Sequence, residues 1–322
     1  MKDQKPKVIV TRRLPAIVEN RMKELFDVEL NENDIPMSAK ELAVAMGKAD
    51  ILVPTISDTI DSKLLARAGE NLRLIASYGA GFDHIDVQTA RQRGILVSNT
   101  PGVLTDDTAD MTLALMLGVM RRFQEGASLI QKKSWDGWSP SAMLGTRLGG
   151  KRLGILGMGR IGSAVATRAK AFGMEVCAWS ENLNLTHANE IGVLPMSKED
   201  LLKNSDIISI HLVLGDRYKN LITKKELGMM KKTAFLINTS RGLIINENDL
   251  VEALKDEKIA GVGLDVYDKE PLPQDHKLRF LPNALLLPHI GYVTAENYSK
   301  FYSQMIENLE SCLKNKPLRV IS

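Results

Sequence analysis

Three side chains that could carry acid–base and ionic chemistry follow three apolar, strand-like runs in the second half of the chain. Arg241 follows the apolar run in AFLINTSRG, Glu270 lies just beyond the apolar run in GVGLDVYDKEPL, and His289 follows Pro288 in ALLLPHIG. The carboxyl ends of parallel strands meet at one edge of an open α/β sheet, and ligands bind at that edge. We therefore expect these three side chains to gather in one site.

Proton transfer beside a bound anion is the chemistry that such a trio could perform. Arginine presents a planar fork of donors that suits a carboxylate or a polarised carbonyl. Histidine can deliver a proton near neutral pH, and a neighbouring glutamate can orient its ring and stabilise its charged form. Each residue taken singly has a simpler interpretation. His289 could be a surface residue with its hydrogen bonds satisfied, and Glu270 could be a solvated charge in a loop. Arg241 could contact only a phosphate or the other domain. Beside a dinucleotide they form a coherent set.

A glycine-rich turn predicts that dinucleotide site. Gly157, Gly159 and Gly162 complete a G-x-G-x-x-G pattern between an apolar run and a stretch with helical spacing of apolar residues. In this strand–turn–helix context the glycines allow a tight turn, close approach to a pyrophosphate and packing of helix on strand. The helix N-terminus adds free N–H groups and a positive dipole end. The alternative is a glycine-rich turn with a packing role alone.

The residues after the second strand of this unit leave NAD and NADP as equal expectations. An NAD site usually has Asp or Glu about 20 residues beyond the turn, where it holds the ribose hydroxyls. Ser180 occupies that position here, and Glu181 and Asn182 follow it. A serine can donate to a 2′-phosphate, but no Arg or Lys follows to neutralise the phosphate. Glu181 would either repel a phosphate or bind the hydroxyls instead.

Strand and helix patterns alternate along the 322 residues and predict two α/β domains, each with a doubly wound parallel sheet. One sheet precedes Thr100, and another begins at Lys151. A long helical segment over residues 105–131 joins them, and a polar-faced helix is expected over 294–314. The expected strands lie at residues 7–11, 51–54, 72–77, 95–98, 151–156, 176–179, 207–210, 234–238, 261–265 and 285–287.

Composition narrows the class of protein. The hydrophobic fraction of 44% and the charged fraction of 25% are ordinary for a globular protein, and the net charge of +3 argues against a nucleic-acid partner. Cys177 and Cys312 lie far apart without metal-ligand spacing, so neither a disulfide framework nor a metal site is expected. The N-terminus lacks an apolar signal region, and the longest uncharged stretch, 280–295, is too short to cross a membrane. We expect a cytoplasmic enzyme.

The chain resembles the D-isomer-specific 2-hydroxyacid dehydrogenase family over essentially its whole length, and within it the glyoxylate and hydroxypyruvate reductases most. The resemblance implies NAD(P)H-dependent reduction of a small 2-oxo acid to the D-2-hydroxy acid. Short-form D-3-phosphoglycerate dehydrogenase, and a nucleotide-sensing, corepressor-like binding protein, are the alternatives. The stretches that match the family in order and spacing are GAGFDHID, NTPGVLTDDTAD, LGILGMGRIG, LINTSRG, GLDVYDKEPL and LLPHIG.

Site residues follow from the same resemblance. It implies that Arg241, Glu270 and His289 are catalytic, and that the backbone amides around Ala80 and Gly81 hold the substrate carboxylate together with Arg241. The residues implied at the cofactor are Thr105, Gly157, Gly159, Arg160, Ile161, Gly162, Ser180 and Asp265.

The resemblance also implies a split, flavodoxin-like substrate domain of residues 1–101 and 288–322, into which a Rossmann NAD(P)-binding domain of residues 102–287 is inserted. A homodimer is expected, with the helical region after Asp106 in the contact. Trp135 and Trp138 lie in a segment that reaches the neighbouring active site in some relatives, although a core or surface-packing role is an equal alternative. Two residues depart from the common pattern: Tyr292 replaces a small serine, and Asp110 replaces Glu.

Overall fold

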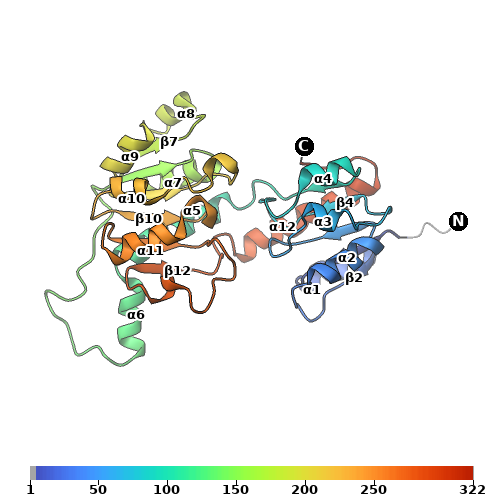
Figure 1. The fold of residues 1–322 in the computed structure, drawn as a ribbon, viewed down its shortest axis with the longest axis horizontal. Coiled ribbons are helices and arrows are strands. Elements are labelled where there is room, and N and C mark those ends of the chain that lie inside the picture. The colour runs from blue at the N-terminus through green and yellow to red at the C-terminus, as the bar shows by residue number, and fades with distance from the viewer. Residues whose placement is uncertain (1–4, 322) are drawn as a thin grey trace. The chain divides into compact units, whose positions relative to one another are not determined.

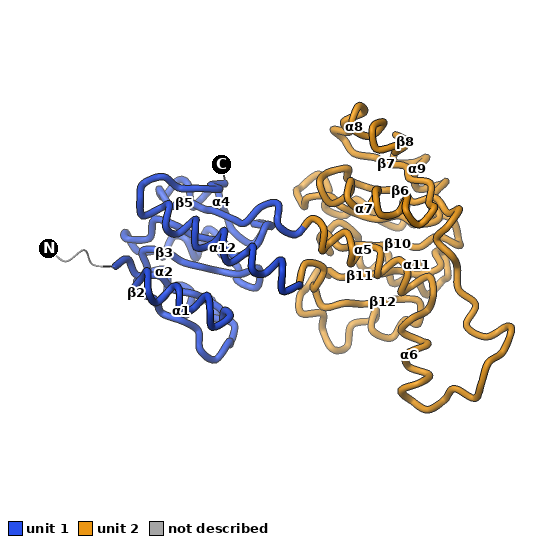
Figure 2. Tube along the Cα trace, turned by 180° about the vertical axis from the view of Figure 1, so that it is seen from behind, with its two compact units in different colours: residues 1–104, 294–322 blue, residues 105–293 orange. Residues whose placement is uncertain are grey.

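The computed structural model describes residues 5–321, which divide into two compact units (Figure 2). Unit 1 comprises the chain up to Leu104 together with the segment from Thr294 onward, and unit 2 is Thr105–Val293. These boundaries lie a few residues later than the expected ones at 101/102 and 287/288. His289 therefore belongs to unit 2 with the glycine-rich turn, and not to the segment that returns to unit 1.

Unit 1 is built on a five-stranded parallel sheet in the order β2-β1-β3-β4-β5. Val8, Ile9 and Val10 are fully buried, as expected for a parallel sheet that is covered on both faces. The order 2-1-3-4-5 is that of flavodoxin-like sheets. The strands are β1 (Lys7–Val10), β2 (Asp27–Glu29), β3 (Ile51–Val53), β4 (Leu74–Ala76) and β5 (Leu96–Ser98).

Helices cover both faces of this sheet. Leu42 and Met46 of α2 pack with α3 and α4 on one face, while Met22 of α1 packs with Met305 and Leu309 of α12 on the other. Side-chain caps mark the starts of all these helices except α1; at α2, for example, Ser38 and Glu41 form a reciprocal capping box. The helices are α1 (Ala16–Leu25), α2 (Ala39–Lys48), α3 (Ser62–Leu65), α4 (Val87–Gln92) and α12 (Ala295–Leu313).

Unit 2 contains a seven-stranded parallel sheet in the order β12-β11-β10-β9-β6-β7-β8 (Figure 1). The strand order reverses between β6 and β9, which is the point where open α/β sheets form a ligand-binding crevice. The strands are β6 (Arg152–Leu156), β7 (Glu175–Trp179), β8 (Leu194–Pro195), β9 (Ile207–Ile210), β10 (Phe235–Asn238), β11 (Gly261–Leu264) and β12 (Ala284–Leu286).

Two helical layers enclose this second sheet. The helices α5, α7 and α8 contribute to the core on one face, and α9, α10 and α11 to the core on the other. The helices are α5 (Thr105–Met120), α6 (Phe123–Gln131), α7 (Arg160–Ala171), α8 (Leu185–Glu190), α9 (Lys198–Asn204), α10 (Lys224–Met229) and α11 (Glu247–Lys255), with short 3₁₀ turns η1 (Asp216–Tyr218), η2 (Gly242–Ile244) and η3 (Lys277–Phe280).

The segment expected as one long helix over 105–131 is in fact two helices. Arg122 adopts a left-handed backbone conformation with φ of 56°, and this ends α5 and redirects the chain into α6. α5 packs against the sheet, whereas α6 contains no buried residue and projects from the body of unit 2 (Figure 1). Over residues 5–321, no helix combines the length and the apolar character needed to span a membrane.

Candidate active site

The glycine-rich turn joins β6 to α7 at the switch point of the unit 2 sheet. Gly157 has φ of 101°, its N–H donates to the Trp179 carbonyl at 2.9 Å, and a Cβ there would lie 2.5 Å from the His211 carbonyl oxygen. A Cβ on Gly162 would collide with the Gly157 carbonyl. At Gly159, in contrast, a Cβ would meet no atom within 4 Å. Two glycines thus allow the close packing of the turn, and the third leaves backbone open to a ligand.

The start of α7 supplies donors beside that open backbone. The helix begins at Arg160, and its N-cap Gly159 brings no side-chain hydrogen bond. The first N–H groups of a helix have no partner within the helix, and the dipole there favours an anion. The main chain at Arg160, Ile161 and Gly162 therefore fits the phosphates of a dinucleotide.

A double ion pair fixes the start of α5 against α7. Arg168 Nε lies 2.5 Å from Asp110 Oδ1, and Arg168 Nη2 lies 3.0 Å from Asp106 Oδ1. Thr105, which the family resemblance implies near the cofactor phosphates, is the first residue of α5. The sequence marked Asp110 only as a departure from the common Glu. In the structure it pairs with Arg168, which sequence reasoning did not single out.

Ser180 follows β7 directly and is half-buried. The register of the two strands pairs Leu156 with Trp179, so Ser180 lies next to the start of the glycine-rich turn. Glu181, one residue further, is paired with Arg217 from η1. An arginine thus lies near Ser180, but it comes from a segment that sequence spacing did not indicate, and it is paired with Glu181.

His289 and Glu270 form a close hydrogen-bonded pair. Nδ1 of His289 lies 2.6 Å from Oε2 of Glu270, and Oε1 of Glu270 accepts a hydrogen bond from the Tyr267 amide at 3.0 Å. The Tyr292 ring stands edge-on to the imidazole with the ring centroids 5.9 Å apart. With Nδ1 engaged by the carboxylate, Nε2 is the ring atom with which His289 can meet a ligand.

The charge state of Glu270 follows from its neighbours. Burial by itself would raise the pKa of this carboxyl, because it disfavours the charged form. The hydrogen bond and charge of His289, the Tyr267 amide and the charge of Arg241 outweigh burial, and together they lower the Glu270 pKa below its ordinary value. The pair therefore presents an ionised carboxylate to the imidazole.

Arg241 follows β10, and a local network shapes the turn that carries it. Asn238 Nδ2 donates to the Arg241 carbonyl at 2.8 Å, and Asn238 Oδ1 accepts from the Ser240 amide at 3.0 Å. Arg241 Nη1 donates to the Ser240 carbonyl at 2.8 Å. Since β10, β11 and β12 are neighbours, Arg241, Glu270 and His289 all lie beyond the carboxyl edge of adjacent strands.

Asp265 is buried behind the His289 loop. Its Oδ1 accepts from the Ile290 amide at 2.8 Å and its Oδ2 from the Gly291 amide at 2.7 Å, so both oxygens hold the backbone that follows His289. Burial raises the Asp265 pKa, although both amides favour the ionised form. In this arrangement Asp265 positions the loop that carries the histidine.

Ala80 and Gly81 belong to unit 1, in the loop after β4. The Ala80 carbonyl accepts a hydrogen bond from Asn99 Nδ2 at 2.7 Å, and the Asn99 carbonyl accepts from Asn308 Nδ2 at 2.9 Å. These contacts tie the loop to the segment after β5 and to α12, both within unit 1. Two buried amide side chains, those of Asn99 and Asn308, therefore hold the backbone of this loop.

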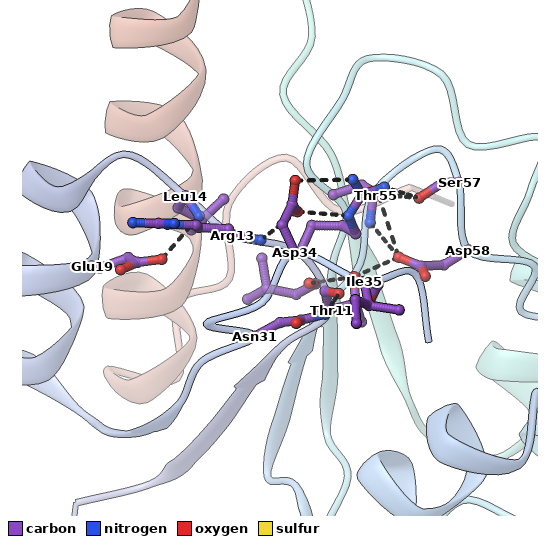
Figure 3. A network of polar contacts seen from close by, with 12 residues as sticks. Thr11, Arg13, Leu14, Glu19, Asn31, Asp34, Ile35, Thr55, Ser57 and Asp58 are labelled. Carbon is purple, nitrogen blue, oxygen red and sulfur yellow. Dashed lines mark hydrogen bonds and ion pairs between the residues drawn. The ribbon is translucent and has the colours of Figure 1, made fainter. Parts of the chain in front are cut away.

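A polar network at the carboxyl ends of β1 and β3 supports the same edge of unit 1 (Figure 3). Buried Asp58 accepts from Thr11 Oγ1 at 2.5 Å and from the Thr55 amide at 2.8 Å. The Tyr78 amide in turn donates to the Pro54 carbonyl at 2.9 Å. Asp58 thus ties the turn after β3 to the end of β1, and the Pro54 carbonyl ties that turn to the residue before the Ala80 loop. Sequence reasoning missed this residue because its partner Thr11 lies 47 residues away in the chain.

The α/β fold of unit 2, with its glycine-rich turn and the polar trio on one sheet edge, is typical of a nucleotide-dependent dehydrogenase. The chain belongs to the D-isomer specific 2-hydroxyacid dehydrogenase family, whose NAD-binding-domain model matches residues 113–291. It is thus an NAD(P)-dependent D-2-hydroxyacid dehydrogenase.

Named relatives and solved structures align with almost the whole length of this chain. A glyoxylate reductase of Aeropyrum pernix is 42% identical over 317 residues, which cover 97% of this chain and 94% of that protein. A glyoxylate reductase of Korarchaeum cryptofilum is 40% identical over 95% of this chain and 92% of that one. A crystal structure of a Thermus thermophilus protein matches with a TM-score of 0.89 and 40% identity, covering 98% of this chain and 100% of that one. A glyoxylate reductase structure from Paecilomyes thermophila matches with a TM-score of 0.85 and 32% identity, covering 100% and 99%.

Proposed function

We propose that this protein reduces glyoxylate or hydroxypyruvate to the D-2-hydroxy acid, with NADH or NADPH as the reductant. The observation that carries the proposal is the His289–Glu270 pair, which lies on the sheet edge that also holds the glycine-rich turn. The relatives named glyoxylate reductases support this substrate class.

In the proposed reaction, His289 donates a proton from Nε2 to the carbonyl oxygen of the 2-oxo acid. Glu270 keeps the imidazole oriented through Nδ1, and its ionised carboxylate stabilises the protonated ring. A bound nicotinamide supplies the hydride that C2 of the acid accepts. Arg241 holds the substrate carboxylate with its planar donor fork, assisted by the backbone amides at Ala80 and Gly81. Fixing the carboxylate limits the motion of the reacting carbon and lowers the entropic cost of reaction.

The cofactor is proposed to bind along the carboxyl edge of the unit 2 sheet. The phosphates would meet the backbone of the glycine-rich turn and the first turn of α7, with Thr105 beside them. Ser180 lies on the adenosine side, and Asp265 acts by holding the loop that carries His289. The residues proposed for these contacts are Thr105, Gly157, Gly159, Arg160, Ile161, Gly162, Ser180 and Asp265.

A homodimer formed through the α6 region is proposed as the working assembly. α6 contains no buried residue, and the segment after it exposes both tryptophans, Trp135 at 60% and Trp138 at 84%. Large apolar side chains gathered on one projecting segment are typical of a protein contact. Light scattering of the purified chain tests this, with Trp138→Ser as the variant expected to weaken the dimer; a monomeric wild type would contradict it.

The direct test of the proposed reaction follows the reduced nicotinamide band while glyoxylate or hydroxypyruvate is added with NADH or NADPH. Turnover of either acid supports the proposal. Tight cofactor binding without turnover of either acid would contradict it and favour a nucleotide-sensing role. A clear preference for a phosphorylated acid would instead favour the phosphoglycerate dehydrogenase alternative.

A further inference from the structure

An ion pair links two separate loops, one after β7 and one after β9, on either side of the strand that leads into the glycine-rich turn. Arg217 Nη1 donates to Glu181 Oε2, and the Tyr218 hydroxyl donates to the same oxygen at 3.3 Å. The Arg217 guanidinium also lies over the Tyr218 ring, 5.4 Å from its centroid. Glu181 and Arg217 are 36 residues apart, so this contact is a product of the fold and not of local sequence.

The position of this pair follows from the strand order. Glu181 comes two residues after the end of β7, and Arg217 lies in η1, the turn that follows β9. Since β7 and β9 flank β6, the pair joins the loops on either side of the strand that leads into the glycine-rich turn. The contacts from Gly157 to the Trp179 carbonyl, and from the His211 amide to the Leu156 carbonyl at 2.7 Å, tie both neighbouring strands to that turn.

The charge of this pair bears on which ribose could bind beside it. The hydrogen bond and charge of Arg217 lower the Glu181 pKa, so the carboxylate is ionised at neutral pH. An ionised carboxylate accepts hydrogen bonds from ribose hydroxyls and repels a 2′-phosphate. A guanidinium is the preferred partner of a phosphate, but here its charge is neutralised by the carboxylate.

We propose that the Glu181–Arg217 pair selects NAD(H). Glu181 accepts a hydrogen bond from the 2′-hydroxyl of the adenosine ribose. Arg217 orients Glu181, and the same ion pair keeps Arg217 from binding a 2′-phosphate. Arg217 is then a specificity-determining residue, a ready phosphate ligand that Glu181 keeps occupied. The proposal rests on the proposed function only in so far as the chain binds a nicotinamide dinucleotide.

Removal of the Glu181 charge should release Arg217 and invert the preference. In Glu181→Gln the ratio of kcat/KM with NADPH to that with NADH is expected to rise roughly 10- to 100-fold, the range of one charge-assisted hydrogen bond. The double variant Glu181→Gln with Arg217→Ala should lose that gain. Glu252→Gln is the matched control, since it breaks the exposed Lys224–Glu252 pair elsewhere on unit 2 and should leave the ratio unchanged.

Calorimetric binding of 5′-ADP and 2′,5′-ADP separates this proposal from the proposed reaction. The wild type should prefer 5′-ADP, and Glu181→Gln should shift the preference toward 2′,5′-ADP. A wild type that prefers NADPH and 2′,5′-ADP, or a Glu181→Gln variant with unchanged ratios, would overturn the proposal. If the binding preference inverts but neither glyoxylate nor hydroxypyruvate is reduced, the proposed function fails while the assignment of the pair stands.

Discussion

Nδ1 of His289 and Oε2 of Glu270 are 2.6 Å apart, and the second oxygen of Glu270 is held by the Tyr267 amide. The carboxylate is thus fixed at both oxygens, and the imidazole is fixed through its Nδ1. Two features of the backbone set the position of the imidazole ring. His289 has a left-handed backbone conformation with φ of 58°, and Asp265 accepts hydrogen bonds from the next two amides. A preorganised pair of this kind needs little rearrangement when a proton is transferred.

Replacement of the imidazole should abolish turnover while leaving the cofactor site intact. In His289→Ala we expect kcat to fall by at least about 100-fold, the lower range for loss of a general acid. The Kd for NADH should change little, because the glycine-rich turn and α7 are untouched. Steady-state kinetics and fluorescence titration with NADH measure the two effects. Near-normal turnover would refute the proposed role of His289.

Glu270→Gln should make reduction more sensitive to alkaline pH. The amide keeps the shape of the side chain but removes the negative charge that stabilises the protonated ring. The decline of kcat/KM on the alkaline side of the profile should therefore move to lower pH than in the wild type. A pH profile of reduction from about pH 5 to 9, which brackets the ordinary titration range of histidine, measures the shift.

The stability of the same variant provides an independent check. The Glu270 pKa is lowered in the folded chain, so its charged form contributes stability that is fully present above the unfolded value of about 4.3. That contribution is lost as the pH falls through the folded value. Glu270→Gln should thus be less stable than the wild type at neutral pH, and the difference should narrow in acid. Urea unfolding at neutral and acidic pH would contradict this if the difference stayed constant.

Arg241→Lys tests whether the planar fork matters beyond its charge. Lysine keeps the positive charge near Glu270 but cannot bind a carboxylate in the two-pronged geometry of a guanidinium. We expect KM for the 2-oxo acid to rise and kcat to fall together, with a combined loss in kcat/KM of roughly 10- to 100-fold, about the size of one charge-assisted hydrogen bond. Unchanged kinetics would exclude Arg241 from the substrate contact.

Hydrophobic patterning predicted most of the fold because its strands are buried on both faces. Runs such as Val8–Val10 and Ile207–Ile210 consist of fully buried residues that are almost all apolar, which leaves a clear signal. The edge strand β2, with Asp27 and Glu29 exposed, carries no such signal and was missed. The break between α5 and α6 was missed as well, since the left-handed residue is an arginine and not a glycine.

The residues of the candidate site likewise fall into those that the sequence indicates and those that it does not. Arg241, Glu270 and His289 could be singled out because each follows an apolar strand within a few residues, and parallel strands bring their carboxyl ends together. Pairs such as Arg168–Asp110 and Glu181–Arg217 could not be found, because they depend on how distant loops and helices meet. Spacing in a single sequence contains no record of such contacts.

Gly159→Ala should weaken dinucleotide binding without weakening the fold. A Cβ at this position meets no protein atom within 4 Å and the backbone φ of −81° suits alanine, so the folded chain tolerates the methyl group. The methyl group would occupy the space through which a pyrophosphate approaches the backbone. We expect at least about a tenfold rise in the Kd for NADH, which corresponds to roughly 1.4 kcal/mol, with an unchanged melting temperature.

Gly228→Ala is the matched control for that variant. Gly228 lies in α10, its Cβ position is equally open, and alanine in a helix is more favourable than glycine by roughly 0.5–1 kcal/mol. This change should leave the Kd unchanged and raise the melting temperature slightly. Equal loss of NADH affinity in both variants would show that Gly159 has no special contact with the cofactor.

Asp265→Asn should loosen the loop after His289. The asparagine oxygen can accept one of the two backbone hydrogen bonds. Its NH₂ group, which is a donor, would face the second amide N–H, where aspartate now offers an acceptor oxygen. One buried amide is left without an acceptor, which costs about 1–3 kcal/mol of the free energy of unfolding. Because the misplaced loop carries His289, kcat should fall more than the affinity for NADH. Urea unfolding, kinetics and NADH titration measure these three quantities, and a stable variant with full kcat would remove Asp265 from the positioning of His289.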